Sequence, residues 1–130
     1  MVKKNTCVFI SGAGSNLKNL ILRSRDNSFP INIKLIISDN KNAYGIVYAK
    51  KNSIPYFIIN TKLRYFEHQL FKILQQNKIS LICLAGYMKI LSKNFIKKFG
   101  NKIINIHPSL LPKYKGLNTF KRILKTNEKK

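Results

Sequence analysis

Short apolar segments alternate with longer segments of helical periodicity along almost the whole chain, and no other feature of the sequence restricts the possible folds so strongly. The apolar segments have the length of strands and cover residues 6–11, 31–38, 54–60, 79–86 and 102–107. The segments with helical periodicity are residues 16–24, 43–52, 65–77, 93–99 and 117–127. Strands that alternate with helices in this way form right-handed βαβ units around a parallel sheet. We therefore predict an α/β fold with an open, mostly parallel sheet and helices on both of its faces.

Two of the predicted strands are apolar over their central positions. Residues 56–59 read "YFII" and residues 81–85 read "LICLA". Strands that are buried on both faces of a parallel sheet have such continuous apolar runs, so we expect both segments to be buried. The chain contains no internal repeat, low-complexity tract or linker, and we expect residues 1–130 to form a single domain.

The formal net charge is +21, with 25 lysines and arginines against 4 acidic residues. An excess this large is typical of proteins that bind nucleic acids or anionic membranes. Lysine heavily outnumbers arginine, however, although the planar arginine side chain is better suited to phosphate and base recognition. The lysines are also spread over almost every segment and do not form a stripe with interleaved aromatic residues. We expect a solvated basic surface with no specific nucleic-acid partner and no membrane partner. A lysine-rich nucleic-acid-binding module stays the alternative.

Metal sites, membrane spans and secretory signals have recognisable patterns, and the sequence contains none of them. Cys7 and Cys83 lie in apolar segments without the spacing of metal ligands, so we expect two buried free thiols and no metal. No apolar run approaches the roughly 20 residues that cross a bilayer, and the apolar part of the N-terminal segment is too short for a signal peptide. We therefore expect a cytoplasmic protein.

Unusual residues follow three of the predicted strands. In open parallel sheets, ligands bind beyond the carboxyl ends of the strands, at the point where the strand order reverses. The sequence "SGAGSN" (residues 11–16) follows the first strand, "GYMKIL" (86–91) the fourth and "HPSLLPKYKG" (107–116) the fifth. We predict that these three loops form the functional site.

The first of these loops has the composition of a phosphate site. Its two glycines let the backbone approach a ligand closely, and the helix that follows presents free N–H groups and its positive dipole end to an anion. The loop matches neither the dinucleotide-binding fingerprint nor a Walker loop. Judged alone, it fits equally well an ordinary strand-to-helix turn in which Ser15 or Asn16 caps the helix.

The fifth predicted strand ends in an asparagine and a histidine. Asn105 and His107 are two residues apart and therefore point to the same side of the strand, while Ile106 points into the core. An amide can hydrogen-bond a carbonyl oxygen, and an imidazole can move protons near neutral pH. Pro108 restricts the backbone of His107 and holds it at the strand end, so the pair favours a catalytic role. By contrast, we expect His68, in the middle of the third predicted helix, to be a surface residue.

The loop after the fourth strand carries Met88, Ile90 and Leu91 beside accessible backbone. Such a loop can line an apolar slot for a flat aromatic ligand, with backbone N–H and C=O groups at its edge. The alternative is ordinary packing at the start of a helix, and the loop alone favours that alternative.

Taken together, the segments "ISGAGSNL", "LAGYMKIL" and "NIHPSLLPKYKGLNT" resemble those of the glycinamide ribonucleotide formyltransferases, which are folate-dependent enzymes of purine biosynthesis. The resemblance extends over essentially the whole chain. The third segment is specific to the wider formyltransferase family, and the "GSNL" turn is most similar to its glycinamide ribonucleotide members. The resemblance implies the Rossmann-like N-terminal part of an enzyme that transfers a formyl group from the co-substrate 10-formyltetrahydrofolate to the amine of 5′-phosphoribosylglycinamide.

The resemblance also implies roles for individual residues. The residues expected to hold the substrate phosphate are Gly14, Ser15 and Asn16. The residues expected to contact the folate are Arg64, Met88, Lys89, Ile90, Leu91 and Asn105. Of these, Lys89 stands where the family commonly has arginine, and Arg64 matches an arginine near the start of the third helix. Asn105 and His107 would stabilise the developing oxyanion and shuttle protons.

Members of the family continue beyond the position that matches Lys130, and their continuation contains an aspartate that pairs with the catalytic histidine. The acidic residues of this chain lie in no matching motif; they are Asp26, Asp39, Glu67 and Glu128. We therefore expect a C-terminally truncated or split member of the family. Loss of the carboxylate would lower the rate on the order of 10²-fold. An uncovered sheet edge would favour self-association or a complementing C-terminal chain.

Two alternatives keep the same fold. The first is a catalytically impaired or decayed fragment that binds only phosphate and folate. The second is a formyltetrahydrofolate hydrolase or another formyltransferase, because these proteins share the Asn-x-His element.

Overall fold

The structure, a computed structural model, describes residues 2–106 of the 130-residue chain. The strands are β1 (Lys4–Ile10), β2 (Ile31–Ser38), β3 (Tyr56–Ile58), β4 (Leu81–Leu84) and β5 (Ile103–Asn105). The helices are α1 (Ser15–Ser24), α2 (Gly45–Lys51), α3 (Phe66–Gln76) and α4 (Lys93–Phe99), and a 3₁₀ turn, η1 (Gly100–Lys102), leads into β5. The predicted loop 107–116, with His107, and the predicted helix 117–127 lie outside the described residues.

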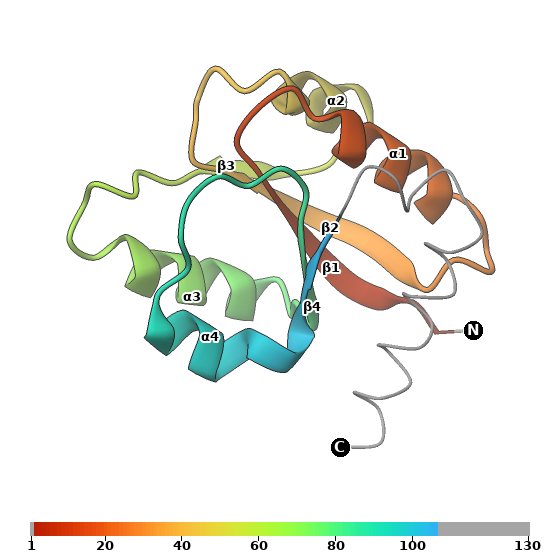
Figure 1. Ribbon diagram of the computed structural model, residues 1–130. Coiled ribbons are helices and arrows are strands. Elements are labelled where there is room, and N and C mark those ends of the chain that lie inside the picture. The colour runs from red at the N-terminus through yellow and green to blue at the C-terminus, as the bar shows by residue number, and fades with distance from the viewer. Residues whose placement is uncertain (1, 107–130) are drawn as a thin grey trace.

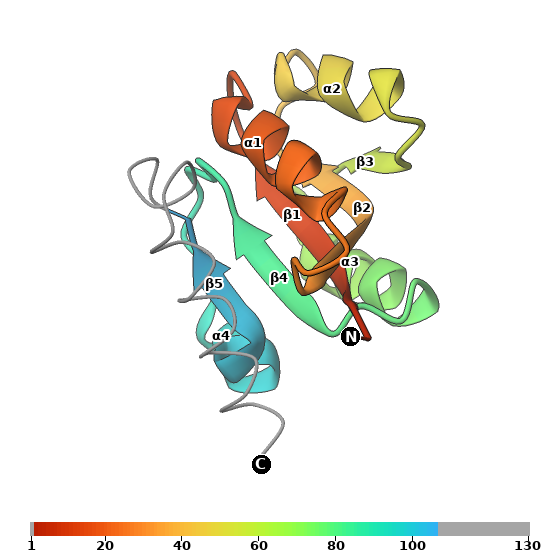
Figure 2. The same ribbon diagram turned by 90° about the vertical axis from the view of Figure 1, so that its right-hand side faces the viewer.

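The five strands form one sheet in the order β3-β2-β1-β4-β5, and all neighbouring pairs are parallel. Helices α1 and α2 lie over one face of the sheet, and α3 and α4 lie over the other (Figure 1). The same separation into three layers is visible in the turned view (Figure 2). The predicted α/β fold, with a parallel sheet and helices on both faces, is thus confirmed.

The alternation of side chains along β1 divides the core into two parts. Val8 and Ile10 belong to the cluster under α1 and α2, whereas Cys7 and Phe9 belong to the cluster under α3 and α4. All four side chains are fully buried, because β1 is the central strand and helices cover it on both faces. The continuous apolar run of β1 is therefore required by its central position.

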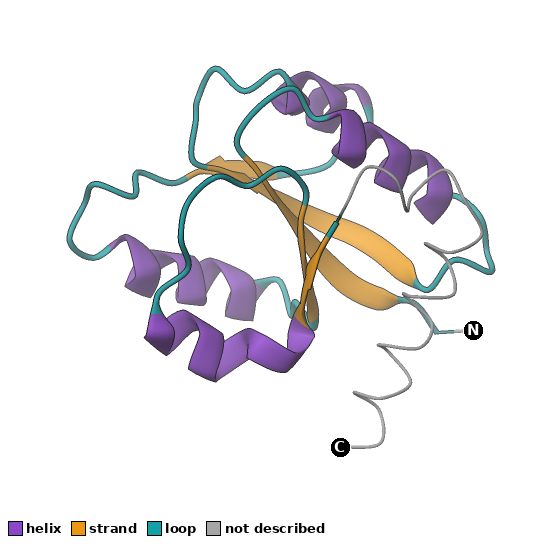
Figure 3. Ribbon diagram, in the orientation of Figure 1, coloured by secondary structure: helices purple, strands orange, loops and turns teal. Residues whose placement is uncertain are grey.

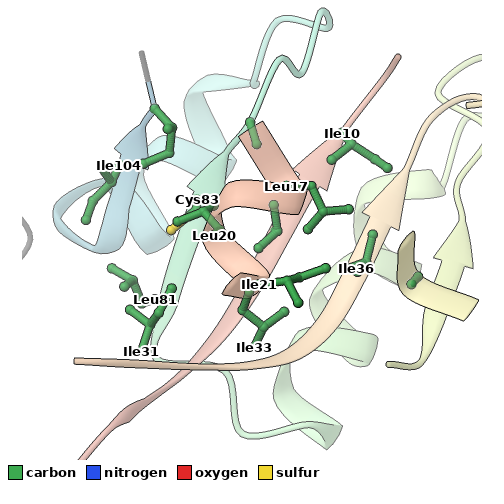
Figure 4. Close-up of a cluster of buried hydrophobic side chains, with 14 of the residues drawn as sticks. Ile10, Leu17, Leu20, Ile21, Ile31, Ile33, Ile36, Leu81, Cys83 and Ile104 are labelled. Carbon is green, nitrogen blue, oxygen red and sulfur yellow. The ribbon is translucent and has the colours of Figure 1, made fainter. Parts of the chain in front are cut away.

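Helix α1 buries its apolar stripe against the centre of the sheet. Leu20 and Ile21 follow Leu17 by three and four residues, so all three lie on one face of the helix. They pack over side chains that include Ile10 and Cys83 (Figure 4). Full burial of a leucine side chain contributes roughly 1.5–3 kcal/mol, so these contacts hold the start of α1 firmly at the end of β1.

The two strands predicted to be buried differ in the structure. Residues Leu81–Cys83 of β4 are fully buried, as predicted, because β4 lies between β1 and β5. For residues 56–59 the prediction holds only for Ile59, which follows β3 and is buried; within the strand it is wrong, since Phe57 and Ile58 are each 42% exposed. The reason is that β3 has only three residues and pairs with β2 alone, at the edge of the sheet. Continuous apolar sequence therefore did not distinguish an edge strand from a central one.

Candidate functional site

The strand order reverses between β1 and β4. From β1 the chain moves outward through β2 to β3, and it then returns to the other side of β1 to form β4 and β5. Connections that leave adjacent strands in opposite directions open a crevice at their carboxyl ends, where ligands of such sheets bind. The loops that follow β1 and β4 meet at this edge (Figure 3). The structure thus brings together the first two of the three predicted loops.

The β1–α1 loop ends in an uncapped helix N-terminus. Gly14 is the residue before the helix, it has the left-handed φ of 81°, and no side chain accepts a hydrogen bond from the first turn. The alternative in which Ser15 or Asn16 caps the helix is therefore wrong, because both residues lie within the first helical turn. The first intrahelical bond runs from Lys18 N to Gly14 O at 2.8 Å. The backbone N–H groups before Lys18 consequently have no acceptor within the helix and are available to an anion.

The same loop packs closely against the start of α2. A Cβ atom built on Gly14 would lie 2.5 Å from the Gly45 Cα atom, and one on Gly45 would lie 2.5 Å from Ile10 Cδ1. The Gly45 N–H donates to Gly12 O at 3.2 Å, and Asn40 Nδ2 donates to Ser11 O at 3.3 Å. Two glycines in van der Waals contact thus fix the path of the loop.

The loop between β4 and α4, residues 85–92, is held by three contacts. The Met88 N–H donates to Ser11 Oγ at 2.9 Å, which joins this loop to the end of β1. The Tyr87 ring packs edge-on against Phe9 with a centroid distance of 5.3 Å. The Ser92 hydroxyl donates to Glu67 Oε1 at 2.6 Å, which joins the loop to the first turn of α3.

The side chains at the tip of this loop point outward. Met88 is 78% exposed and Ile90 is 97% exposed, and Lys89 is also exposed. Leu91 is half-buried against the α3/α4 core cluster, and Ser92 caps α4 by accepting from Phe95 N at 3.0 Å. The alternative of ordinary packing at the start of a helix therefore holds for the end of the loop, at Leu91 and Ser92. Its tip instead offers two apolar side chains and free backbone to a ligand.

Asn105 is the last residue of β5 and pairs in register with Leu84, the last residue of β4. Its side chain is exposed, whereas the following Ile106 is buried, so the predicted alternation is confirmed for these two residues. This register places Asn105 beside the start of the β4–α4 loop. His107 lies outside the residues that the structure describes.

Arg64 lies in the turn that precedes α3, and its guanidinium stacks on the Tyr65 ring at 5.5 Å from the ring centroid. Both residues, together with His68, line an open cavity of about 410 Å³ at the start of α3. His68 is exposed, as predicted. Because Glu67 contacts Ser92, the start of α3 lies next to the end of the β4–α4 loop.

One ionisable side chain of the β4–α4 loop, Tyr87, has a strongly shifted pKa. Burial, with smaller effects of Asp39 and Glu67, raises the pKa of Tyr87 to about 12, so its phenol is a hydrogen-bond donor and not a base. Asp39 Oδ1 is the one buried side-chain polar atom within residues 2–106 that has no hydrogen-bond partner. It directly follows β2, next to the β1 loop.

The two cysteines are buried free thiols, as predicted. Burial, and for Cys7 also the proximity of Cys83, raises the pKa of both thiols, that of Cys83 to about 12, so neither is a nucleophile in the folded chain. Within residues 2–106, no three His, Cys, Asp or Glu side chains gather into a group that could hold a metal ion. The helices of this part of the chain are all too short or too polar to cross a membrane. The cytoplasmic location stays a prediction.

Two contacts of the site were not foreseen from the sequence. The Ser11–Met88 and Ser92–Glu67 hydrogen bonds join residues 77 and 25 positions apart, respectively, and no local pattern indicates such pairs. One signal was available for Ser92, since a serine before a segment of helical periodicity is typical of a helix cap.

The fold is that of an open-sheet α/β protein, a class that binds ligands where the strand order reverses, and in this sheet the reversal lies between β1 and β4. A family model described as formyl transferase matches residues 4–130. The chain belongs to the formyl transferase family.

Individual relatives point to one branch of this family. The chain is 41% identical over 129 residues to the phosphoribosylglycinamide formyltransferase of Haemophilus influenzae, a match that covers 96% of this chain and 61% of that protein. It is 40% identical over 126 residues to the trifunctional purine biosynthetic protein adenosine-3 of Bos taurus, covering 94% of this chain and 12% of that protein. The chain thus spans about three fifths of the length of the first relative and a small part of the second.

Solved structures agree with this placement. The phosphoribosylglycinamide formyltransferase of Brucella melitensis is similar with a TM-score of 0.77 and 36% identity, covering 96% of this chain and 67% of that one. The corresponding protein of Coxiella burnetii, solved in complex with CHES, has a TM-score of 0.75 and 39% identity, covering 96% of this chain and 61% of that one. A formyltetrahydrofolate deformylase from Pseudomonas putida shares the fold at 23% identity, with a TM-score of 0.71 over 81% of this chain and 38% of that one.

Proposed function

We propose that this protein transfers the formyl group of 10-formyltetrahydrofolate to the amine of 5′-phosphoribosylglycinamide. The observation that carries the proposal lies at the carboxyl ends of β1 and β4, where the loop before an uncapped helix N-terminus is hydrogen-bonded to a loop with exposed apolar side chains. The helix N-terminus suits a phosphate, which 5′-phosphoribosylglycinamide carries. The exposed apolar side chains suit a flat aromatic ring, which the folate carries. Membership of the family and the names of the relatives support the same chemistry.

The phosphate of the ribonucleotide would bind at the start of α1. Free backbone N–H groups and the positive end of the helix dipole favour a dianionic group there, and Gly14 allows it to approach closely. We assign Gly14, Ser15 and Asn16 to this role. Ser15 is exposed and Asn16 is half-exposed, so both are accessible to a ligand.

The folate would bind along the β4–α4 loop. Met88 and Ile90 offer exposed apolar surface, and the backbone of residues 89–91 offers donors and acceptors for the edge of a pterin ring. Arg64, at the start of α3, would bind a carboxylate of the folate tail, since guanidinium–carboxylate pairs are strong and directional. Lys89 supplies a further exposed cation.

Asn105 and His107 would carry out the transfer. The amine nitrogen of the ribonucleotide forms a bond to the formyl carbon, and the formyl oxygen becomes an oxyanion to which the Asn105 amide donates a hydrogen bond. The bond between the formyl carbon and N10 of the folate then breaks. N10 gains one proton and the attacking nitrogen loses one, and His107 is assigned this proton transfer.

The proposal is tested by following the formation of tetrahydrofolate from 10-formyltetrahydrofolate, with and without 5′-phosphoribosylglycinamide. We expect turnover only when the ribonucleotide is present. Loss of one oxyanion donor lowers kcat by about 10²–10³-fold, so Asn105→Ala should show a loss of this size. Asn101→Ala is the matched control, because Asn101 is an exposed asparagine four residues earlier in η1. It should leave kcat unchanged.

Other outcomes would replace the proposal. Tetrahydrofolate formation that is independent of the ribonucleotide would identify a hydrolase. Folate binding without turnover would leave a binding protein. Tight binding of single-stranded RNA at physiological salt, without folate binding, would identify a nucleic-acid-binding module whose affinity collapses as salt is added.

A further inference from the structure

The β4–α4 loop is fastened on both sides of its exposed tip. The Met88 N–H is bonded to Ser11 Oγ on one side, and the Ser92 hydroxyl is bonded to Glu67 on the other. Only three residues, 89–91, lie between these two fixed points. The backbone of the tip is therefore held, although Met88 and Ile90 have exposed side chains.

The bond between Ser92 and Glu67 has a fixed direction. A hydroxyl has one proton to donate, and Ser92 Oγ already accepts a hydrogen bond from Phe95 N at 3.0 Å as the cap of α4. The Ser92 proton therefore goes to Glu67 Oε1, at a distance of 2.6 Å.

Glu67 is held between two helices. It is half-buried in the first turn of α3, where the positive end of the helix dipole stabilises a carboxylate. It is also one of only 4 acidic residues in a chain with 25 lysines and arginines. The side-chain partner of Glu67 is nevertheless not one of these cations but Ser92, at the start of α4. The carboxylate thus couples the position of α3 to the end of the β4–α4 loop.

We infer that Glu67 is a positioning residue for the folate: through Ser92 it fixes the backbone of residues 88–91 in the conformation that binds the pterin ring. This inference rests on the proposed function. A loop that is fixed before the ligand arrives does not lose conformational freedom on binding, so its anchor contributes to affinity without touching the ligand. Glu67 should therefore act on the binding of the folate and not on the transfer step.

The test compares variants of Glu67 by isothermal titration with 5-formyltetrahydrofolate, a stable folate, and separately with inorganic phosphate. Loss of a hydrogen bond to a charged group corresponds to about a ten-fold change in affinity. We expect Glu67→Ala to weaken folate binding by about that factor and to leave phosphate binding unchanged. Glu67→Gln retains an oxygen acceptor and should recover most of the affinity. Gln75→Ala, at an exposed position of the same helix, is the matched control.

A second pair of measurements separates positioning from a general loss of structure. Ser92→Ala should weaken folate binding at least as much as Glu67→Ala does, because it removes the α4 cap as well as the shared bond. The double variant should bind no more weakly than Ser92→Ala alone, because the bond that Glu67→Ala removes is then already absent. In the transfer assay, Glu67→Ala should raise the KM for 10-formyltetrahydrofolate and leave kcat unchanged.

The inference is overturned if Glu67→Ala binds the folate as tightly as the unmodified chain does. It is also overturned if Glu67→Ala weakens phosphate and folate binding equally, or if the effects of the two single variants add. If the unmodified chain binds no folate at all, the proposed function fails first and this inference falls with it, so the two failures are distinguishable.

Discussion

The contact between Gly14 and Gly45 predicts a large loss of stability from a single methyl group. In Gly14→Ala, the new Cβ atom would lie 2.5 Å from the Gly45 Cα atom, a backbone atom that cannot rotate away. The residue must also keep a φ of 81°, which costs an L-amino acid about 1–2 kcal/mol. Displacement of the loop adds to this cost. We expect a loss of about 2–4 kcal/mol in the free energy of unfolding, in the range of severe single substitutions.

Substitutions at two other glycines separate the steric cost of the new methyl group from the conformational cost of a positive φ. Gly86 has a positive φ of 73° but nothing within 4 Å of its built Cβ atom, so Gly86→Ala should show the conformational cost alone, about 1–2 kcal/mol. Gly12 has neither a positive φ nor a neighbour within 4 Å. Gly12→Ala should therefore be neutral or stabilising by up to about 1 kcal/mol, because alanine restricts the unfolded chain.

Urea unfolding followed by circular dichroism measures all three variants against the unmodified chain. The predicted order of stability is Gly12→Ala, then Gly86→Ala, then Gly14→Ala, and thermal midpoints should follow it, with a fall of roughly 6–12 °C for the last. Equal losses for Gly14→Ala and Gly86→Ala would show that the contact with Gly45 has no steric consequence. No loss for either would refute the argument from φ as well.

Two further predictions concern protons that the fold retains. Because the pKa of the Cys83 thiol is raised from 9.0 to about 12, its thiolate fraction near pH 8 is about 10³-fold below that of a free cysteine. Mass spectrometry after iodoacetamide treatment should therefore find Cys7 and Cys83 unmodified in the folded chain and alkylated in urea; rapid alkylation of the folded chain would contradict the burial of both thiols. The raised pKa values of Cys83 and Tyr87 also set a pH dependence: the unfolded chain loses these protons first, so stability is fully present below about pH 9 and falls as pH rises toward 12. The urea midpoint should be lower at about pH 10.5 than at about pH 8, and an unchanged midpoint would show that the two groups titrate normally in the fold.

The elements that could be predicted from the sequence are those with strong local patterns. Residues 31–38 and 93–99 form β2 and α4 with the predicted bounds, and the apolar run of β4 correctly indicated a buried strand. The run "YFII" has the same pattern but lies at the sheet edge. Burial there depends on the strand order, which no local pattern contains.

For the site, too, the sequence indicated the local features but not the contacts between distant segments. The glycine-rich sequence after β1 predicted a loop whose backbone approaches a ligand closely, and this stays a prediction; the close neighbour of Gly14 in the structure is the backbone of Gly45. The position of Asn105 beside the end of β4 followed from the topology of parallel sheets. The bond from Ser92 to Glu67 could not be predicted, because it depends on how α3 and α4 pack across the sheet. Local patterns thus identify the loops of the site, whereas contacts between distant segments fix their geometry.

The most direct test of the proposed chemistry follows the formyl carbon itself. Folate labelled with ¹³C in the 10-formyl group is incubated with the protein and 5′-phosphoribosylglycinamide, and the label is followed by NMR. We predict that the formyl signal moves from the folate to the glycinamide nitrogen, with one tetrahydrofolate formed for each formyl group transferred. Appearance of the label as free formate, or a formyl signal that stays on the folate while the ribonucleotide is bound, would contradict the proposed formyl transfer.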